Sequence, residues 1–251
     1  MQYLFYIILG LLPSFIWLSF YLRKDKHPEP NSMVLKIFIW GILLAPLAII
    51  LELLLIWLLD PSVPLSSLFS HISEDNFIKI ILINALIPAL VEEYLKYSVV
   101  RVRILRNSEF DEPVDAMIYC IIAGLGFAAI ENLLIIFKIY SDFGQLLSTI
   151  GLRFLGATLV HALSSGIVGY WLALSLLYTK QRRRLILFGL TVAIIFHACY
   201  NYLIIVLLNQ TANQTTLFIL IVAVLLVTVA LLVSSYFRKL KKQQSICKIN
   251  E

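Results

Sequence analysis

Long apolar runs separated by short polar segments follow one another along the chain. A helix of about 20 apolar residues crosses the hydrocarbon core of a bilayer, and several runs reach that length. The predicted spans are Leu4–Leu22, Met33–Leu59, Phe77–Val100, Val114–Phe137, Leu147–Tyr178, Leu185–Leu208 and Thr216–Phe237. The fifth run is long enough to tilt or break. The pattern therefore predicts an all-α, polytopic bundle of about seven transmembrane helices.

Composition agrees with this prediction. Of the 251 residues, 61% are hydrophobic and 14% are charged, and the mean hydropathy is +0.92. These values lie outside the range of soluble globular domains. No internal repeat or low-complexity tract divides the chain. We therefore expect one membrane-embedded domain over residues 1–251, of which residues 238–251 form a short basic tail.

The basic residues are concentrated in alternate loops and in the tail. They are Arg23, Lys24 and Lys26, then Arg101, Arg103 and Arg106, then Lys180 and Arg182 to Arg184, and finally Arg238, Lys239, Lys241 and Lys242. Cytoplasmic loops carry an excess of Lys and Arg, so the C-terminus is predicted to be cytoplasmic and the N-terminus to lie outside. Because each cluster adjoins a span, it suits anionic lipid head groups, and we expect no nucleic-acid partner.

The third span carries two adjacent carboxylates, Glu92 and Glu93. One charged residue at the centre of a membrane helix costs roughly 2.5–3.5 kcal/mol, so ionisable residues there indicate a functional site. Lys96 lies within one turn of both carboxylates and can pair with either. A structural Glu–Lys pair is the alternative, although one lysine needs only one carboxylate. Pro88 cannot donate to the carbonyl of Asn84, so the helix is expected to kink or open there.

Other spans carry polar residues at compatible depths. Glu131 follows a run of small residues that permits close helix approach. His161 lies near the middle of the fifth span, and His197 and Asn201 share one face of the sixth at i, i+4 spacing. We expect these side chains to converge with the two glutamates near the membrane midplane.

Two further arrangements follow from the sequence. Glu52 of the second span and Arg153 of the fifth enter from the same side at similar depth, and we expect them to form a structural ion pair. Ser165, one turn after His161, makes a Ser–His dyad conceivable. The small residues around it are more typical of a packing face.

Taken together, these residues resemble a known family. Glu92-Glu93-x-x-Lys96, Gly126-Phe-Ala-x-x-Glu131-Asn132, His161-Ala and His197-x-x-x-Asn201 follow in this order on successive spans. This ordered set is similar to the PrsW family of intramembrane proteases, from about residue 23 to residue 202. That family is similar in turn to the CAAX prenyl endopeptidases and bacteriocin-processing proteins. Their usual Glu-Glu-x-x-x-Arg and Phe-x-x-x-His differ here at Lys96 and Glu131, which argues against prenyl substrates.

The resemblance implies a multi-pass protease of the bacterial plasma membrane that cuts a membrane-tethered, single-pass regulator such as an anti-sigma factor. Peptide hydrolysis needs a base to activate water and donors for the developing oxyanion. Glu92 or Glu93 fits the base, and Glu93 is favoured because Glu92 is better oriented to pair with Lys96. The remaining expected site residues are His197 and Asn201 as donors, His161 with Glu131 to orient water or protonate the leaving amine, and Lys96, Phe127 and Asn132 as support.

No cofactor is expected from the sequence. Glu and His side chains suit Zn²⁺, and Glu93, His161 and His197 would be its ligands if an ion is bound, but no H-E-x-x-H spacing occurs. Three other functions stay open. Chains of acidic residues and histidines across a bundle also suit a proton-coupled transporter. A CAAX-type prenyl endopeptidase and a non-catalytic adaptor with buried polar packing residues are the others.

Overall fold

The structure, a computed structural model, describes residues 2–25, 27–59, 61, 79, 81–105, 107, 110–139, 143–208 and 212–243. Over these residues the chain is helical and contains no strand, which confirms the predicted fold class. The helices are α1 (Gln2–Leu22), α2 (Asn31–Leu59), the π-helical turn η2 (Leu82–Leu86), α4 (Ile87–Arg103), α5 (Asp115–Ile139), α6 (Phe143–Leu155), α7 (Ala157–Leu177), the short 3₁₀ turn η3 (Thr179–Gln181), α8 (Arg182–Leu208) and α9 (Ala212–Leu240). The start of the expected third span and the tail after Gln243 lie outside the described residues.

Six segments within the described ranges are long and apolar enough to cross a membrane. They are Tyr3–Leu22, Asn31–Leu59, Asp115–Lys138, Phe143–Leu177, Thr179–Leu207 and Thr215–Leu240. The expected third span corresponds to η2 and α4, which differ from the others because α4 carries Glu92, Glu93 and Lys96. The chain is therefore a multi-pass membrane protein.

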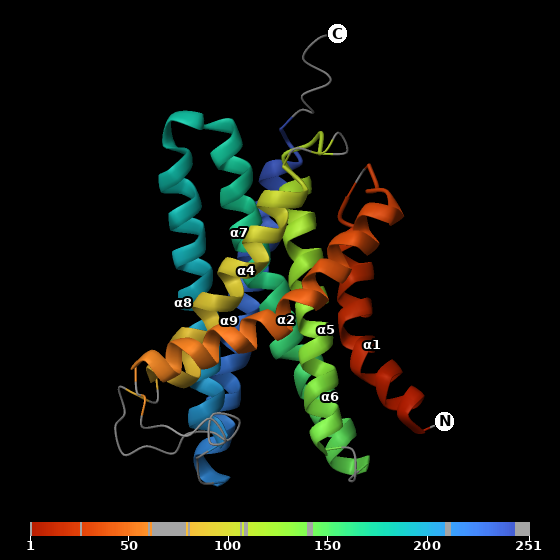
Figure 1. The fold of residues 1–251 in the computed structure, drawn as a ribbon, viewed down its shortest axis with the longest axis vertical. Helices are drawn as coiled ribbons and strands as arrows, with labels where there is room; N and C mark the ends of the chain where they lie inside the picture. Colours follow the sequence, from red (N-terminus) through yellow and green to blue (C-terminus); the bar gives the residue numbers. More distant parts are fainter. Residues whose placement is uncertain are drawn as a thin grey trace.

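The basic segments lie at one end of the bundle. Figure 1 places the α1–α2 connection, the end of α4, the α7–α8 connection and the end of α9 toward the top of the view. The start of α1 lies toward the opposite end of the bundle from the end of α9 (Figure 1). This arrangement agrees with the sorting of charge along the sequence, while the assignment of that end to the cytoplasm stays a prediction.

Helix α5 is the centre of the bundle, and α1, α2, α4, α6 and α7 all contact it. Its side chains from 116 to 123 are almost completely buried. Two glycines let α2 approach closely. A Cβ atom on Gly126 would collide with the backbone carbonyl of Phe38, and one on Gly41 with that of Ala123. The small residues of α5 thus bring α2 against the helix that carries Glu131.

The helix opens immediately before α4, as Pro88 predicts. In the π turn η2, the N–H of Ile87 bonds to the carbonyl of Leu82, five residues back. Pro88 then occupies the first turn of α4, a position at which a residue without an N–H is tolerated. The two glutamates follow this opening by about one turn.

The long fifth span breaks at Gly156, between α6 and α7. The backbone of Gly156 leaves helical geometry (φ −106°, ψ −97°), and a Cβ there would collide with the hydroxyl of Tyr200. The break lets Arg153 before it and His161 after it reach the same oxygen of Glu131. The expected tilt or break is therefore a break.

Candidate functional site

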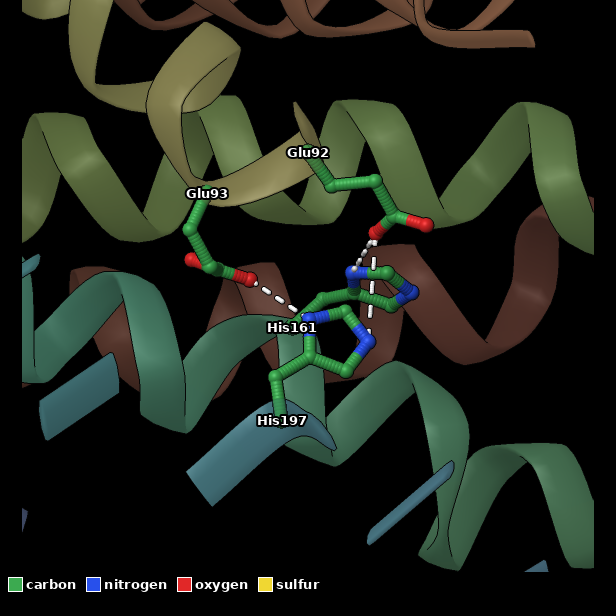
Figure 2. A group of neighbouring side chains, drawn as sticks. All are labelled: Glu92, Glu93, His161 and His197. Carbon is green, nitrogen blue, oxygen red and sulfur yellow. Dashed lines mark hydrogen bonds and ion pairs between the residues drawn. The ribbon is translucent and has the colours of Figure 1, made fainter. Parts of the chain in front are cut away.

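Four of the expected site residues meet inside the bundle. Figure 2 shows Glu92 and Glu93 of α4 facing His161 of α7 and His197 of α8. One ligand-type atom from each of the four lies within 4.8 Å of the others, and all four residues are buried. The imidazole rings are perpendicular, with centroids 5.1 Å apart. The sequence placed these residues on three different spans, and the fold brings them together.

Glu93 is fixed by three hydrogen-bond donors. Its Oε1 atom accepts from Lys96 Nζ at 2.8 Å, Ser164 Oγ at 2.9 Å and His197 Nδ1 at 2.7 Å. These donors belong to α4, α7 and α8, so the carboxylate joins three helices. No solvent reaches the side chain, and its Oε2 atom has no hydrogen-bond partner among the described residues. Ser164 was not predicted as a site residue; its position one turn after His161 is the only sequence signal for it.

Glu92 has longer contacts and reaches a cavity. Its Oε2 atom lies 3.3 Å from Lys96 Nζ, 3.6 Å from His161 Nδ1 and 3.8 Å from His197 Nε2. The cavity has a volume of about 140 Å³ and lies between α2, α4 and α5, where Glu52 and Glu131 line it with Glu92. Its other lining residues are apolar. Glu92 is thus the member of the pair that borders open space.

Lys96 lies between the carboxylates and His161. Its Nζ atom is 2.7 Å from His161 Nδ1, in addition to its contacts with both glutamates. The ring of Phe127 lies beneath it, with the ammonium 4.8 Å from the ring centroid. Only 2% of Lys96 is exposed. The ammonium is therefore enclosed by acceptors and by an aromatic face, which both favour a cation.

The ring protons of the two histidines follow from their partners. An ammonium only donates, so His161 Nδ1 accepts from Lys96 and the ring proton lies on Nε2, which donates to Glu131 Oε2 at 2.7 Å. A carboxylate without a proton only accepts, so His197 Nδ1 donates to Glu93 and its Nε2 atom faces Glu92. Each imidazole is oriented by a carboxylate.

The predicted ion pair between Glu52 and Arg153 is wrong. Arg153 donates to Glu131 Oε2 at 3.1 Å and to Asn132 Oδ1 at 2.5 Å, and Glu52 lines the cavity instead. Similar depth on two spans does not determine which faces meet, and the break at Gly156 leaves Arg153 facing α5. Asn132 in turn donates to Thr158 Oγ1 at 3.0 Å. These contacts extend the buried polar network from the glutamates to α6.

Asn201 is less closely connected. It is half-buried on α8, one turn after His197, and within the described part of the chain no hydrogen bond joins it to the four central residues. Phe127 contacts both Lys96 and His161, whose ring centroid lies 5.6 Å from its own. The structure thus places Phe127 in the site and Asn201 at its margin.

The chain is similar to one family over most of its length. Residues 29–232 match the family described as "PrsW family intramembrane metalloprotease". A protein named Protease PrsW from Oceanobacillus iheyensis is 29% identical over 195 residues, which cover 78% of this chain and 80% of that protein. Proteins of the same name from Geobacillus kaustophilus (28% over 197 residues; 78% of each chain) and Bacillus subtilis (26% over 202 residues; 80% of this chain and 83% of that protein) are also similar. No solved structure matches the chain.

Proposed function

The chain belongs to the PrsW family of intramembrane proteases, and from this premise we propose that it hydrolyses its peptide substrate with water activated by Glu92. The observation that carries the proposal is the difference between the adjacent carboxylates. Glu93 is committed to three donors, whereas Glu92 borders the cavity between α2, α4 and α5. A base must be within hydrogen-bond reach of the water that it deprotonates, and the cavity gives Glu92 that access. This assignment reverses the preference for Glu93 drawn from helical spacing.

The proposed reaction uses groups that the site already orients. Glu92 Oε2 and His197 Nε2 lie 3.8 Å apart, a separation at which one water molecule can contact both. Glu92 takes a proton from this water while the oxygen of the water forms a bond to the scissile carbonyl carbon. The carbon–nitrogen bond then breaks, and the proton passes from Glu92 to the leaving amine. Glu93 holds His197 toward Glu92, and Glu131 holds His161 in the same way.

The four ligand-type residues do not form a suitable Zn²⁺ site while the ammonium of Lys96 lies among them. Two glutamates and two histidines are ligand types that Zn²⁺ takes, and the family is described as a metalloprotease family. The ammonium of Lys96, however, lies within 3.3 Å of donor atoms of Glu92, Glu93 and His161. A divalent ion among these atoms would lie against this positive charge. The proposed steps therefore use the side chains alone.

The proposed substrate is a single-pass membrane protein, and an anti-sigma factor is an example of that class. The site lies among membrane-spanning helices, which suits a scissile bond that belongs to a membrane-tethered substrate. The cavity against α2 and α5 is lined mainly by apolar side chains, which suits a hydrophobic segment of substrate. Family membership supports this function over a proton-coupled transporter or a non-catalytic adaptor.

The test is cleavage by purified, chelator-treated protein of a single-pass peptide substrate in detergent or vesicles. A variant with both Glu92→Gln and Glu93→Gln keeps the shape of both side chains but has no carboxylate base. We expect its cleavage rate to fall by at least about 10²-fold, the lower range for loss of a general base. Full cleavage by this variant would contradict the glutamate mechanism. Wild-type activity that is lost on chelation and restored only by Zn²⁺ would replace it with metal-dependent hydrolysis.

A further inference from the structure

We infer that the ammonium of Lys96 is the built-in cation of this site: it occupies the position among the carboxylates and imidazoles that a metal ion would take, and its removal creates a metal site. The inference deepens the proposed function and rests on it for the role of the carboxylates. Lys96 is a positioning residue, because it acts through the groups around it.

The ammonium of Lys96 is close to most of the atoms that would bind a metal ion. Three of the four ligand-type residues present an atom to Lys96 Nζ: His161 Nδ1 at 2.7 Å, Glu93 Oε1 at 2.8 Å and Glu92 Oε2 at 3.3 Å. Zn²⁺ binds nitrogen and oxygen ligands at about 2.0–2.2 Å, so an ion bound by the same three atoms would lie close to the ammonium. The two cations exclude one another.

The orientation of His161 also opposes metal binding. Its Nδ1 atom accepts from the ammonium, and its Nε2 atom donates to Glu131. Nδ1 is also the His161 atom nearest to Glu92, at 3.6 Å, and so the atom that faces the other ligands. An imidazole nitrogen has one lone pair, which serves either a hydrogen bond from Lys96 or a metal ion. Lys96 thus takes the lone pair that coordination needs.

The buried charge of Lys96 also balances the charge of the two glutamates. Lys96 is 98% buried against Phe127, and its positive charge offsets two carboxylates that share the same interior. Without it, Glu92 and Glu93 would lie together without a cation between them, and Oε2 of Glu93 already has no partner among the residues described. Divalent transition metals bind groups of this kind: carboxylate oxygens and imidazole nitrogens that have free lone pairs and carry a net negative charge.

The test measures the affinity of metal-stripped protein in detergent for Zn²⁺ alone by isothermal titration. Lys96→Met keeps the length of the side chain and removes its charge, and we expect it to bind Zn²⁺ at least about a hundredfold more tightly than wild type, because a like charge no longer opposes the ion. Lys96→Arg, which keeps the charge, should match wild type. The control is Lys239→Met, the same substitution at an exposed lysine of α9, which should also match wild type.

Thermal unfolding gives a second readout if Lys96→Met unfolds when metal is removed. Added Zn²⁺ should raise the unfolding temperature of Lys96→Met and leave that of wild type unchanged. Tight, stoichiometric Zn²⁺ binding by wild type, or no gain in affinity and no Zn²⁺-dependent stabilisation in Lys96→Met, would overturn the inference. Neither readout uses cleavage, so failure of the glutamate mechanism would appear in the cleavage test and leave these affinities unchanged.

Discussion

Glu92 and Glu93 project from α4 in directions about 100° apart, because successive residues of an α-helix are rotated by that angle. This rotation turns Glu93 toward Ser164 and His197, where it accepts three hydrogen bonds, and turns Glu92 toward the cavity beside α2 and α5. One carboxylate therefore fixes the histidine while its neighbour is left accessible. The two adjacent glutamates therefore have different surroundings, which is the basis for proposing different roles for them.

Glu29, in the connection before α2, leads to a prediction about pH. Burial raises its pKa to about 8, against the opposing effect of a hydrogen bond from Tyr119, and the nearby Asp115 adds to the rise. The folded chain thus holds a proton that the unfolded chain, with an ordinary pKa of about 4.3, releases. The stability from this group is present at low pH and is lost as pH rises through about 8. The unfolding temperature should therefore fall between about pH 5 and pH 8.5, and Glu29→Gln should reduce that fall. An equal fall in both proteins would contradict the assignment.

The residues of the site were easier to predict than their partners. A charge or an imidazole within an apolar span is conspicuous, so Glu92, Glu93, His161 and His197 could be selected from the sequence. Pairing depends on the rotation of each helix about its axis, which apolar spans do not reveal. For this reason the Glu131 partner of Arg153 was missed.

Among the helices, close packing between α2 and α5 positions α2 as one wall of the cavity. Gly126 of α5 lies against the backbone of Phe38, and Gly41 of α2 lies against that of Ala123. Backbone carbonyls are less able to move aside than flexible side chains. This contact brings α2, with Glu52, to the cavity that Glu92 and Glu131 line.

Gly126→Ala tests this packing. The added methyl group would collide with the Phe38 carbonyl, and overpacking of this kind costs about 1–3 kcal/mol. We expect a lower unfolding temperature in detergent. Gly151→Ala on α6 is the matched control, because a Cβ there meets no atom within 4 Å and alanine is the better helix former. Equal stability of Gly126→Ala and wild type would show that α2 and α5 are not held this closely.

The helical, membrane-spanning architecture was predicted from hydropathy, since long apolar segments in a bilayer satisfy their backbone groups by forming helices. Pro88 also predicted the opening before α4, because a missing donor has a local effect. The position of the break at Gly156 was not predicted. The expected fifth span continues on both sides of Gly156, and the close approach of Tyr200 to this glycine is visible only in the folded chain.

The whole molecule has an apolar outer surface and a polar site in its interior. Basic connections gather at one end of the bundle, apolar side chains of α1, α2 and α9 face outward, and the carboxylates and histidines lie inside. Intramembrane charges are stable when they face the interior of a bundle and pair with one another. In the proposed function, the same enclosure keeps these oriented groups away from bulk water.

If Glu92 is the base, the cleavage rate should depend strongly on its carboxylate, and Glu92→Gln removes that carboxylate while keeping the shape of the side chain. Glu29→Gln makes the same substitution at another buried carboxylate, remote from α4 in sequence and outside the site. Measured with the same single-pass substrate in chelator-treated protein, Glu92→Gln should lose at least about 10²-fold in rate with its unfolding temperature retained, and Glu29→Gln should keep the wild-type rate. A Glu92→Gln protein that is folded and cleaves at the wild-type rate would show that Glu92 is not the base.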